Sequence, residues 1–227
     1  MTDWFDRLPT DRLIAEFSLW SADLVRLADD LTRIAPHADI LHVDVADGHF
    51  APALLFFPDL VAQCRKVSKT PVHIHLMSAD AILEAQIEQF AEAGAELISV
   101  HAENGNAGAA LDLIRSKGLR AGLVLKVTTS VTAALPHLPQ IDFLTLLGTA
   151  IGVKGQGLDP TACDRLTQAR GLVAGQGRRI VVAADGGIRD HTVPDLRAAG
   201  AETVVLGSLA FGAPDLAARM GWLRGLG

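Results

Sequence analysis

Ala93-Gly-Ala-Glu-Leu-Ile-Ser-Val100 shares its first four residues and its apolar ending with Ala199-Gly-Ala-Glu-Thr-Val-Val-Leu206. In both stretches a glycine closes a segment of helical periodicity, and a short run of strand-forming residues follows it. A joint that leads from a helix into a strand and occurs twice predicts a repeated βα unit.

The same alternation continues on both sides of these joints. Residues 21–31 place leucines on one helical face and charged side chains on another, behind Ser21 as an N-cap. We expect strands at residues 13–19, 39–45, 71–76, 96–101, 120–125, 141–146, 179–184 and 202–206. This series of βα units predicts an α/β protein with a single (β/α)8 TIM barrel, one domain over residues 1–227. A doubly wound open sheet is the alternative, but the chain lacks the glycine-rich dinucleotide-binding turn expected after its first strand.

The composition is compatible with one such barrel. The chain has 227 residues, 49% of them hydrophobic, which is enough for a large buried core. Its 20 Lys and Arg against 26 Asp and Glu give a formal net charge of −6, the wrong sign for a nucleic-acid or anionic-membrane surface. We therefore expect no nucleic-acid and no membrane partner, and any anionic ligand must be held by a local pocket.

The cysteines and the first residues bear on location. Cys64 and Cys163 have no CxxC spacing and both fall in predicted helices, so we expect free thiols in a reducing compartment. Residues 1–7 are acidic where a signal peptide is basic, and no uninterrupted apolar run reaches transmembrane length. These features predict a cytoplasmic protein.

Polar side chains interrupt three predicted strands near their C-terminal ends. His42 and Asp44 are two residues apart, so they share one face of an extended strand. His75 and Asp185 occupy similar positions in two further apolar runs. Burial without a partner would cost roughly 2–7 kcal/mol for a hydroxyl-like group and more for a charge, so something must compensate these groups.

A divalent metal ion would compensate all four. Two His and two Asp form a mixed nitrogen and oxygen set that suits Zn²⁺, Fe²⁺, Mn²⁺ or Co²⁺, and the ligand types do not choose among them. A structural hydrogen-bonded pair would explain His42 and Asp44 taken alone, but His75 and Asp185 favour a metal site. His73, on the same strand face as His75 but deeper, is interpreted as a supporting or a core histidine.

A second signal is glycine after the last two strands. Gly186 and Gly187 follow the seventh strand, and Gly207-Ser208 follows the eighth. Backbone N–H groups at these positions of a barrel commonly bind phosphate, although ordinary turns favour the same residues. The glycine-rich loop 152–157, which contains Gly155, is either a segment that closes over a substrate or an ordinary mobile connection.

These motifs, in this order, resemble the ribulose-phosphate 3-epimerase family from about Ala15 to Gly212. The most specific of them is His42-Val-Asp-Val-Ala-Asp-Gly-His-Phe50. The other matching segments are Ser18–Asp23, His75–Met77, Val100–Glu103, Asp185–Ile188, Gly207-Ser208 and Phe211-Gly212. The resemblance implies a TIM barrel of the ribulose-phosphate binding type and a homo-oligomer.

By this resemblance the chain is a metal-dependent isomerase that inverts C3 of a sugar phosphate. His42, Asp44, His75 and Asp185 would bind one divalent ion, and Asp44 and Asp185 would also be the catalytic acid and base. The implied substrate-binding residues are Ser18, His75, Gly155, Gly186, Gly187, Gly207 and Ser208. Inversion needs a proton removed from one face and another returned to the opposite face, which two carboxylates can do while a metal ion stabilises the enediolate.

The departures from the family pattern lie around the substrate and spare the metal set. Ala46 and Leu147 stand where methionine is usual, and Phe17 stands where proline is usual. The loop 150–156 differs from the usual Asn-Pro-Gly-Phe-Gly-Gly-Gln. The substrate therefore stays open: D-ribulose 5-phosphate, converted to D-xylulose 5-phosphate, is the leading candidate, and a hexulose 6-phosphate is an alternative.

Two alternatives fall outside this activity. A paralogue that binds a sugar phosphate without catalysis would fit the altered loop, although it would not need both acid/base carboxylates. A lyase or decarboxylase related to the orotidine-phosphate group would place a lysine between acidic residues on a barrel strand, whereas only Val43 separates His42 from Asp44.

Overall fold

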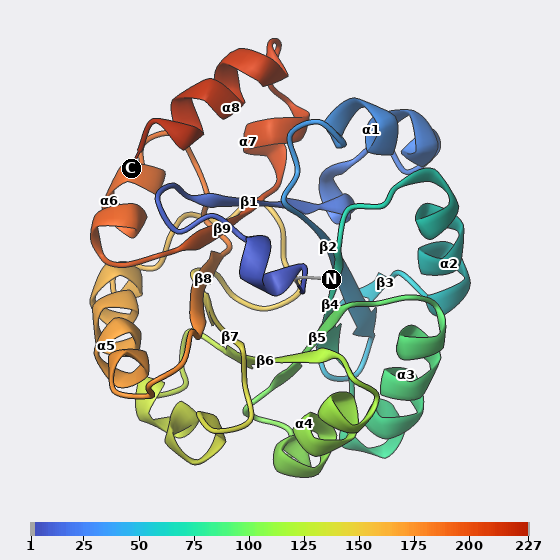
Figure 1. The fold of residues 1–227 in the computed structure, drawn as a ribbon, viewed down its shortest axis with the longest axis vertical. Helices are drawn as coiled ribbons and strands as arrows, with labels where there is room; N and C mark the ends of the chain where they lie inside the picture. Colours follow the sequence, from blue (N-terminus) through green and yellow to red (C-terminus); the bar gives the residue numbers. More distant parts are fainter. Residues whose placement is uncertain (1–2, 227) are drawn as a thin grey trace.

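The computed structural model describes residues 3–226, and in this range eight parallel strands close into a barrel surrounded by helices (Figure 1). The strands follow the order β1-β9-β8-β7-β6-β5-β4-β2, and β1 pairs with β2 to close the ring. A short extra strand, β3, adds to β2 in the antiparallel direction. The predicted (β/α)8 TIM barrel is therefore confirmed.

The strands of the barrel lie within two residues of their predicted bounds. They are β1 (Ile14–Ser18), β2 (Ile40–Asp47), β4 (Val72–Met77), β5 (Leu97–His101), β6 (Arg120–Leu125), β7 (Phe143–Leu147), β8 (Val181–Asp185) and β9 (Thr203–Leu206). The two-residue β3 (Leu54–Leu55) was not predicted. It is too short to show a strand periodicity in the sequence.

The helices form the outer ring. They are α1 (Leu27–Ile34), α2 (Pro58–Val67), α3 (Asp80–Glu92), α4 (Ala107–Ser116), α5 (Ala162–Ala174), α6 (Val193–Ala198), α7 (Ser208–Phe211) and α8 (Leu216–Arg224). Residues 3–226 also contain three 3-10 helices: η1 (Phe5–Arg7), η2 (Leu19–Ser21) and η3 (Val131–His137). In the described range 3–226, no helix is both long and apolar enough to cross a membrane.

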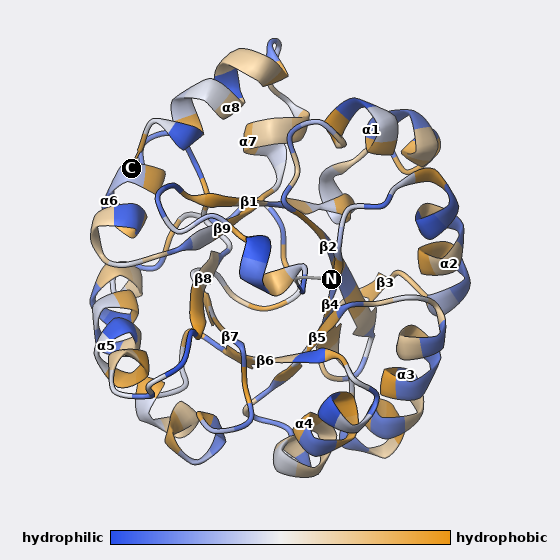
Figure 2. Cartoon of the chain, viewed as in Figure 1, coloured by the Kyte–Doolittle hydropathy of each residue, from blue (hydrophilic) through white to orange (hydrophobic). Residues whose placement is uncertain are grey.

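Each strand divides its side chains between two environments. On β2, Leu41, Val43 and Val45 belong to the large apolar cluster between the strands and the helices. The alternate residues His42 and Asp44 point into the barrel. Figure 2 shows the result as largely hydrophobic strands inside a ring of helices that alternate hydrophobic and hydrophilic residues.

An apolar plug closes the N-terminal mouth of the barrel. Phe5 and Leu8, from the η1 segment, pack against the first inward-facing residues of five strands, and η1 lies over the barrel opening in Figure 1. The strand residues of this plug are Ile14, Ile40, Leu97, Phe143 and Val181. This end of the barrel is therefore filled with apolar side chains.

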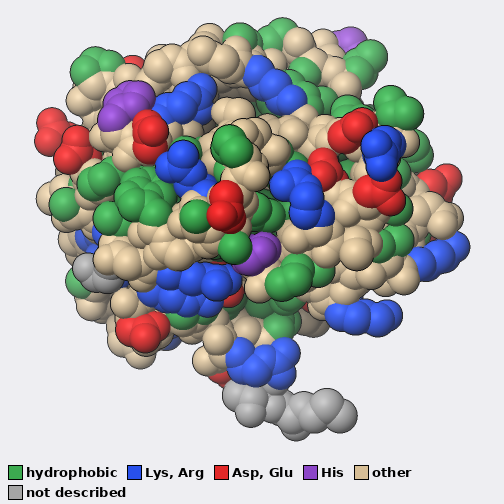
Figure 3. Space-filling model, turned by 90° about the horizontal axis from the view of Figure 1, so that it is seen from above, with side chains coloured by type: hydrophobic (Ala, Val, Ile, Leu, Met, Phe, Trp, Pro, Cys, Tyr) green, Lys and Arg blue, Asp and Glu red, His purple; other side chains and the backbone are tan. Residues whose placement is uncertain are grey.

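The surface charges are mixed, and the cysteines are as the sequence predicts. Basic and acidic side chains are interspersed on the face shown in Figure 3. Cys64 is buried, Cys163 is partly buried, and both are free thiols as predicted.

A close contact inside the barrel requires glycine at position 122. Ser99 on β5 and Gly122 on β6 are partners in the parallel register. A Cβ atom at Gly122 would lie 1.9 Å from Ser99 Oγ and 3.0 Å from Ser99 Cβ. Only glycine therefore leaves room for the Ser99 side chain in its present position.

We expect Gly122→Ala to lower the free energy of unfolding by about 1–3 kcal/mol, because the added methyl group must displace Ser99 in a closely packed interior. Urea unfolding followed by circular dichroism measures the change. The matched control is Gly171→Ala in α5, where an added Cβ meets nothing within 4 Å. That substitution should be neutral or stabilise by up to about 1 kcal/mol; equal stability of the two variants would contradict the steric argument.

Asp47, at the end of β2, ties two loops to the barrel mouth. Its carboxylate accepts hydrogen bonds from the backbone N–H groups of His49, Phe50 and Ala79, at 2.9, 2.8 and 2.7 Å. Partial burial opposes ionisation, but these three donors outweigh it and lower the pKa of Asp47.

We expect Asp47→Asn to lower the free energy of unfolding at pH 7 by about 1 kcal/mol, because a neutral amide replaces a partly exposed carboxylate. Since the folded-state pKa is depressed, the wild-type advantage is complete above the unfolded pKa of about 3.9 and is lost as the pH falls through the folded value. Urea titrations at pH 7 and pH 3 measure this loss, with the exposed Asp11→Asn as control. A difference that stays constant with pH would contradict it.

Candidate functional site

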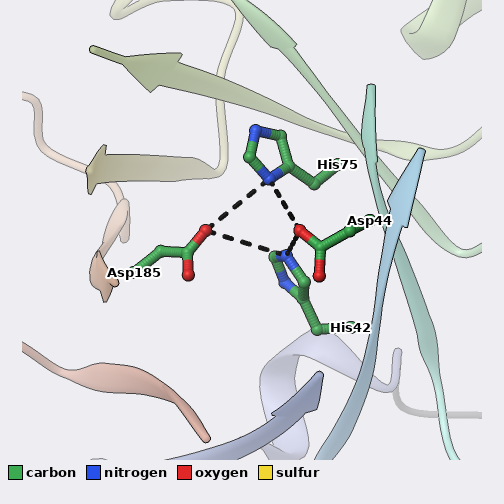
Figure 4. Close-up of side chains that lie close together, drawn as sticks. All are labelled: His42, Asp44, His75 and Asp185. Carbon is green, nitrogen blue, oxygen red and sulfur yellow. Dashed lines mark hydrogen bonds and ion pairs between the residues drawn. The ribbon is translucent and has the colours of Figure 1, made fainter. Parts of the chain in front are cut away.

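The four predicted metal ligands converge at the C-terminal end of the barrel. Asp44 on β2 and His75 on β4 are register partners, and His42 lies one inward step below Asp44. Asp185 is the last residue of β8. One ligand atom from each of the four lies within 4.8 Å of all the others, with Asp185 and Asp44 on opposite sides of the cluster in Figure 4.

Each of the two carboxylates lies within 4 Å of both imidazole rings. Asp44 Oδ1 lies 3.2 Å from His42 Nε2 and 3.3 Å from His75 Nδ1. Asp185 Oδ2 lies 3.6 Å from His75 Nδ1 and 3.9 Å from His42 Nε2. His75 Nδ1 is a buried atom that has no hydrogen-bond partner among the described residues.

This donor set fits a divalent cation. Two imidazole nitrogens and two carboxylate oxygens face one another, and mixed nitrogen and oxygen ligands of this kind bind Zn²⁺ and related ions. His75 Nδ1 is buried without a hydrogen-bond partner among the described residues and lies 3.3 Å from an Asp44 oxygen, so a cation between them would satisfy both atoms.

The surroundings move the pKa values of the two carboxyl groups in opposite directions. Burial favours the neutral form of Asp44, but His42 and His75 outweigh it and hold the pKa of Asp44 well below its usual range. Burial also raises the pKa of Asp185, and there the nearby Asp44 charge adds to it against the opposing effect of the histidines. One carboxylate is thus firmly ionised and the other accepts a proton more readily, as an acid and base pair requires.

Glu16 is a functional candidate that the sequence reasoning missed. This carboxylate is fully buried on β1, and its Oε1 lies 2.7 Å from His42 Nδ1. The same oxygen also contacts His73 Nδ1, while His73 Nε2 lies 2.6 Å from Ser99 Oγ. His73 therefore has partners at both ring nitrogens and supports the cluster from below. The available signal was a carboxylate two residues before Ser18 in an apolar run.

His101 and Glu103 are two further residues to which the sequence reasoning assigned no role in the site. His101 Nε2 lies 2.9 Å from His75 Nε2, and His101 Nδ1 lies 3.0 Å from Glu103 Oε2. Burial lowers the pKa of His101 to about 4, so the ring is neutral at pH 7. The sequence places these residues at the end of a predicted strand but does not show that the ring meets His75.

A cavity of about 410 Å³ opens above the cluster. Asp44 and Asp185 line it, whereas His42 lies beneath them, enclosed in the barrel. All the predicted substrate-binding residues line the same cavity: Ser18, His75, Gly155, Gly186, Gly187, Gly207 and Ser208. The structure therefore brings the two sets of predicted residues together at one mouth.

Backbone geometry explains two of the glycines. Gly186 and Gly187 have φ values of +90° and +71°, which side chains rarely allow. A Cβ atom at Gly186 would lie 2.4 Å from Thr149 Oγ1, and one at Gly187 would lie 2.8 Å from the Leu158 backbone. The turn after β8 thus exposes bare backbone to the cavity.

Ser18 and Lys154 add polar contacts at the mouth. Ser18 Oγ donates a hydrogen bond of 2.8 Å to Asp44 Oδ2, the oxygen that does not face the histidines. Lys154, in the loop between β7 and α5, donates to the carbonyl oxygen of Trp20, and its Nζ lies 4.6 Å from the centre of the Trp20 ring. This loop therefore reaches across the mouth to the end of β1.

A closed barrel with a buried ligand cluster and a glycine-lined cavity at the C-terminal ends of its strands defines the class, an enzyme of the (β/α)8 type. Sequence comparison then identifies the family. The ribulose-phosphate 3 epimerase family profile matches residues 14–211, and the chain belongs to this family. The protein is accordingly a carbohydrate epimerase, an isomerase, and this membership decides against the lyase alternative.

The similar proteins agree with one another. Ribulose-phosphate 3-epimerase 2 of Cupriavidus necator is 36% identical over 204 residues, which cover 87% of this chain and 84% of that protein. Ribulose-phosphate 3-epimerase of Escherichia coli K12 is 32% identical over 201 residues, which cover 87% of this chain and 88% of that protein.

Solved structures with lower identity share the fold. The 3-hexulose-6-phosphate synthase of Salmonella typhimurium superposes with a TM-score of 0.70 at 17% identity, covering 94% of this chain and 98% of that one. The orotidine 5'-phosphate decarboxylase of Pyrococcus horikoshii gives a TM-score of 0.67 at 12% identity, with coverages of 94% and 98%. At these identities the likeness concerns the barrel alone.

We expect chelator-treated protein to bind one divalent ion per chain and to gain stability, because the ion compensates the carboxylates and the His75 lone pair. At a free-ion concentration 1,000 times the Kd, the gain is about 4 kcal/mol. Elemental analysis and thermal unfolding with added Zn²⁺, Mn²⁺, Co²⁺ or Fe²⁺ measure it.

The variant His75→Gln should lose most of this stabilisation, whereas His191→Gln, at an exposed histidine, should retain it. Protein that holds no stoichiometric ion, and whose unfolding temperature no added ion changes, would contradict the metal assignment.

Proposed function

We propose that this chain is a metal-dependent 3-epimerase of a ketose phosphate, with D-ribulose 5-phosphate to D-xylulose 5-phosphate as the leading reaction. One observation carries the proposal: Asp44 and Asp185 direct their carboxylates into one small volume from β2 and β8, two strands that β1 and β9 separate. The two relatives described above are both named ribulose-phosphate 3-epimerase, which supports the choice of substrate.

Two carboxylates match the demands of inversion at a carbon beside a ketone. One removes the C3 proton from one face of the substrate, and the negative charge spreads over the adjacent oxygens as an enediolate. The other then delivers a proton to C3 from the opposite face, which a single rigidly held base cannot readily do. Each carboxyl group ends in the protonation state from which the reverse reaction starts.

His42, Asp44, His75 and Asp185 would hold the divalent ion of this site. When bound, the ion supplies a Lewis-acid charge close to the reacting oxygens. The chain's own groups do the positioning. Ser18 holds Asp44 through Oδ2 and leaves Oδ1 toward the histidines.

The phosphate of the substrate would bind at the bare backbone after β8 and β9. Gly186, Gly187, Gly207 and Ser208 line the cavity; the three glycines would offer backbone N–H groups without side chains in the way, and Ser208 would add its hydroxyl group. Gly155, in the loop that reaches toward Trp20, would close over the bound sugar.

The alternatives follow from the residues around the substrate. Ala46 packs with Ala51 and Met77 beside the cavity, and Leu147 lines it. A hexulose 6-phosphate is the alternative substrate because these positions differ from the usual family pattern. A non-catalytic sugar-phosphate-binding paralogue is a weaker alternative, since both carboxylates are present and meet.

Three expectations remain predictions. They are a single domain over residues 1–227, a cytoplasmic location, and a homo-oligomer. The barrel strands alone extend from residue 14 to residue 206, which supports one domain.

We expect Asp44→Asn and Asp185→Asn to lower C3 proton exchange by about 10²–10⁴-fold, because each removes one of the two proton-transfer groups. The wild type and both variants are incubated with a panel of ketose phosphates in deuterated water, and isomer formation and deuterium entry at C3 are followed by NMR. Asp195→Asn, on α6, serves as the control. Near-normal exchange in either folded variant would remove the acid/base assignment, and binding without exchange in the wild type would favour the non-catalytic alternative.

A further inference from the structure

Both histidines of the ligand cluster are backed by a carboxylate outside it, and the two connections are built differently. We propose that Glu16 and Glu103 are positioning residues that hold His42 and His75 each in the one tautomer whose unprotonated nitrogen faces the cluster. This inference rests on the proposed metal-dependent function and adds residues to it that the ligand set does not include.

Glu16 acts on His42 directly. An ionised carboxylate only accepts hydrogen bonds, so the His42 nitrogen that meets Glu16 Oε1, at 2.7 Å, must carry a proton. That nitrogen is Nδ1. With Nδ1 occupied by this proton, Nε2, which lies 3.2 Å from Asp44 and 3.9 Å from Asp185, is the ring nitrogen that can release its proton and bind a cation. The carboxylate thereby selects Nε2 as the ligand atom.

The Glu16 carboxylate is itself held in place. His73 Nδ1 donates to the same oxygen, and Thr203 Oγ1 lies 3.5 Å from the other oxygen. His73 is fixed in turn by Ser99, whose hydroxyl lies 2.6 Å from Nε2. Glu16 is fully buried, so no water competes for these contacts and its direction toward His42 is set by the interior of the barrel.

Glu103 acts on His75 through a second ring. Its Oε2 accepts the proton on His101 Nδ1 at 3.0 Å, which leaves His101 Nε2 as an acceptor in the neutral ring. That atom lies 2.9 Å from His75 Nε2, so the proton between them belongs to His75. His75 Nδ1 is then unprotonated, and this is the buried atom that faces Asp44 and Asp185 without a partner.

Glu103 is anchored by the loop that follows β6. Its other oxygen, Oε1, accepts from the Lys126 backbone N–H at 2.9 Å and from the Thr129 hydroxyl. Phe50 covers the His101 ring, with 4.9 Å between ring centres. The chain of hydrogen bonds from Glu103 through His101 to His75 is therefore fixed at the Glu103 end, and Phe50 covers one face of its central ring.

The two connections select opposite ring atoms. His42 offers Nε2 and His75 offers Nδ1, because the first ring is held from below by β1 and the second is held from the side by β5. A swap of either tautomer would turn an N–H toward the cluster and remove a ligand. Loss of a carboxylate that orients a ligating histidine commonly lowers metal affinity by about 10–100-fold. Removal of Glu16 and removal of Glu103 should therefore each lower the metal affinity measurably.

The experiment uses the full chain loaded with Zn²⁺ and the variants Glu16→Gln and Glu103→Gln, which keep the side-chain size and remove the charge. Nitrogen NMR of labelled histidines reports which ring nitrogen carries the proton. In the wild type we expect the proton on Nδ1 of His42, on Nε2 of His75 and on Nδ1 of His101. Chelator competition measures the Zn²⁺ affinity, which should fall by about 10–100-fold in each variant.

Asp190→Asn is the matched control, since it removes a carboxylate beside the exposed His191 without touching the cluster. It should leave the Zn²⁺ affinity unchanged. Activity lost by a variant at limiting Zn²⁺ should return at excess Zn²⁺, because a positioning residue is needed for the ion to bind and does not touch the substrate.

The outcomes distinguish a failure of the proposed metal-dependent function from a failure of the positioning roles of Glu16 and Glu103. If the wild type binds no Zn²⁺, the proposed metal-dependent function fails and this inference fails with it. If the wild type binds Zn²⁺ but both variants bind it equally well, or if the wild-type protons lie on the other nitrogens, only this inference fails. The tautomers of the wild type decide the matter even where a variant does not fold.

Discussion

Two carboxylates and two imidazoles share a volume of the barrel that an apolar plug seals from below, and the structure depends on how their charge is compensated. The effective cost of desolvating one ion is several kcal/mol, whereas a whole domain is stable by only about 5–15 kcal/mol. Uncompensated, the cluster would therefore unfold the barrel. Above the plug residues Ile14 and Phe143, the barrel interior is polar. There Glu16, His73 and Ser99 form hydrogen bonds that support the cluster from below.

The positions of the ligands depend on the register of several neighbouring strands. Asp44 is paired with His75, His75 with Ser99, and Ser99 with Gly122, so one line of partners crosses β2, β4, β5 and β6. A slip of one residue would turn the apolar outer face inward and the ligands toward the helices. Gly122 belongs to the same line, because its missing side chain makes space for Ser99, which holds His73.

The sequence predicted the strands and the four ligands because alternation reveals which side chains point into a barrel. His42, Asp44, His75 and Asp185 stand out as polar residues on faces that must be buried. Alternation does not reveal which interior side chains meet across the barrel. Glu16 reaches His42 and His73 from a different strand, and Glu103 reaches His75 only through the His101 ring. These contacts depend on barrel closure and stagger, which no single strand encodes.

Chemistry and selectivity are placed on different parts of this fold. The four ligands stand on strands, where the register and the buried partners fix them, whereas the departures from the family pattern lie at other positions: the loop 150–156 and the strand residues Phe17, Ala46 and Leu147. Lys154 shows the consequence: it contacts Trp20 through both its ring and its carbonyl oxygen, so the loop after β7 is attached to the end of β1 by a cation. Burial lowers the pKa of Lys154, and the Asp44 charge partly opposes that effect. Substitutions in such a loop can change which sugar fits while the strand-borne carboxylates keep the same reaction.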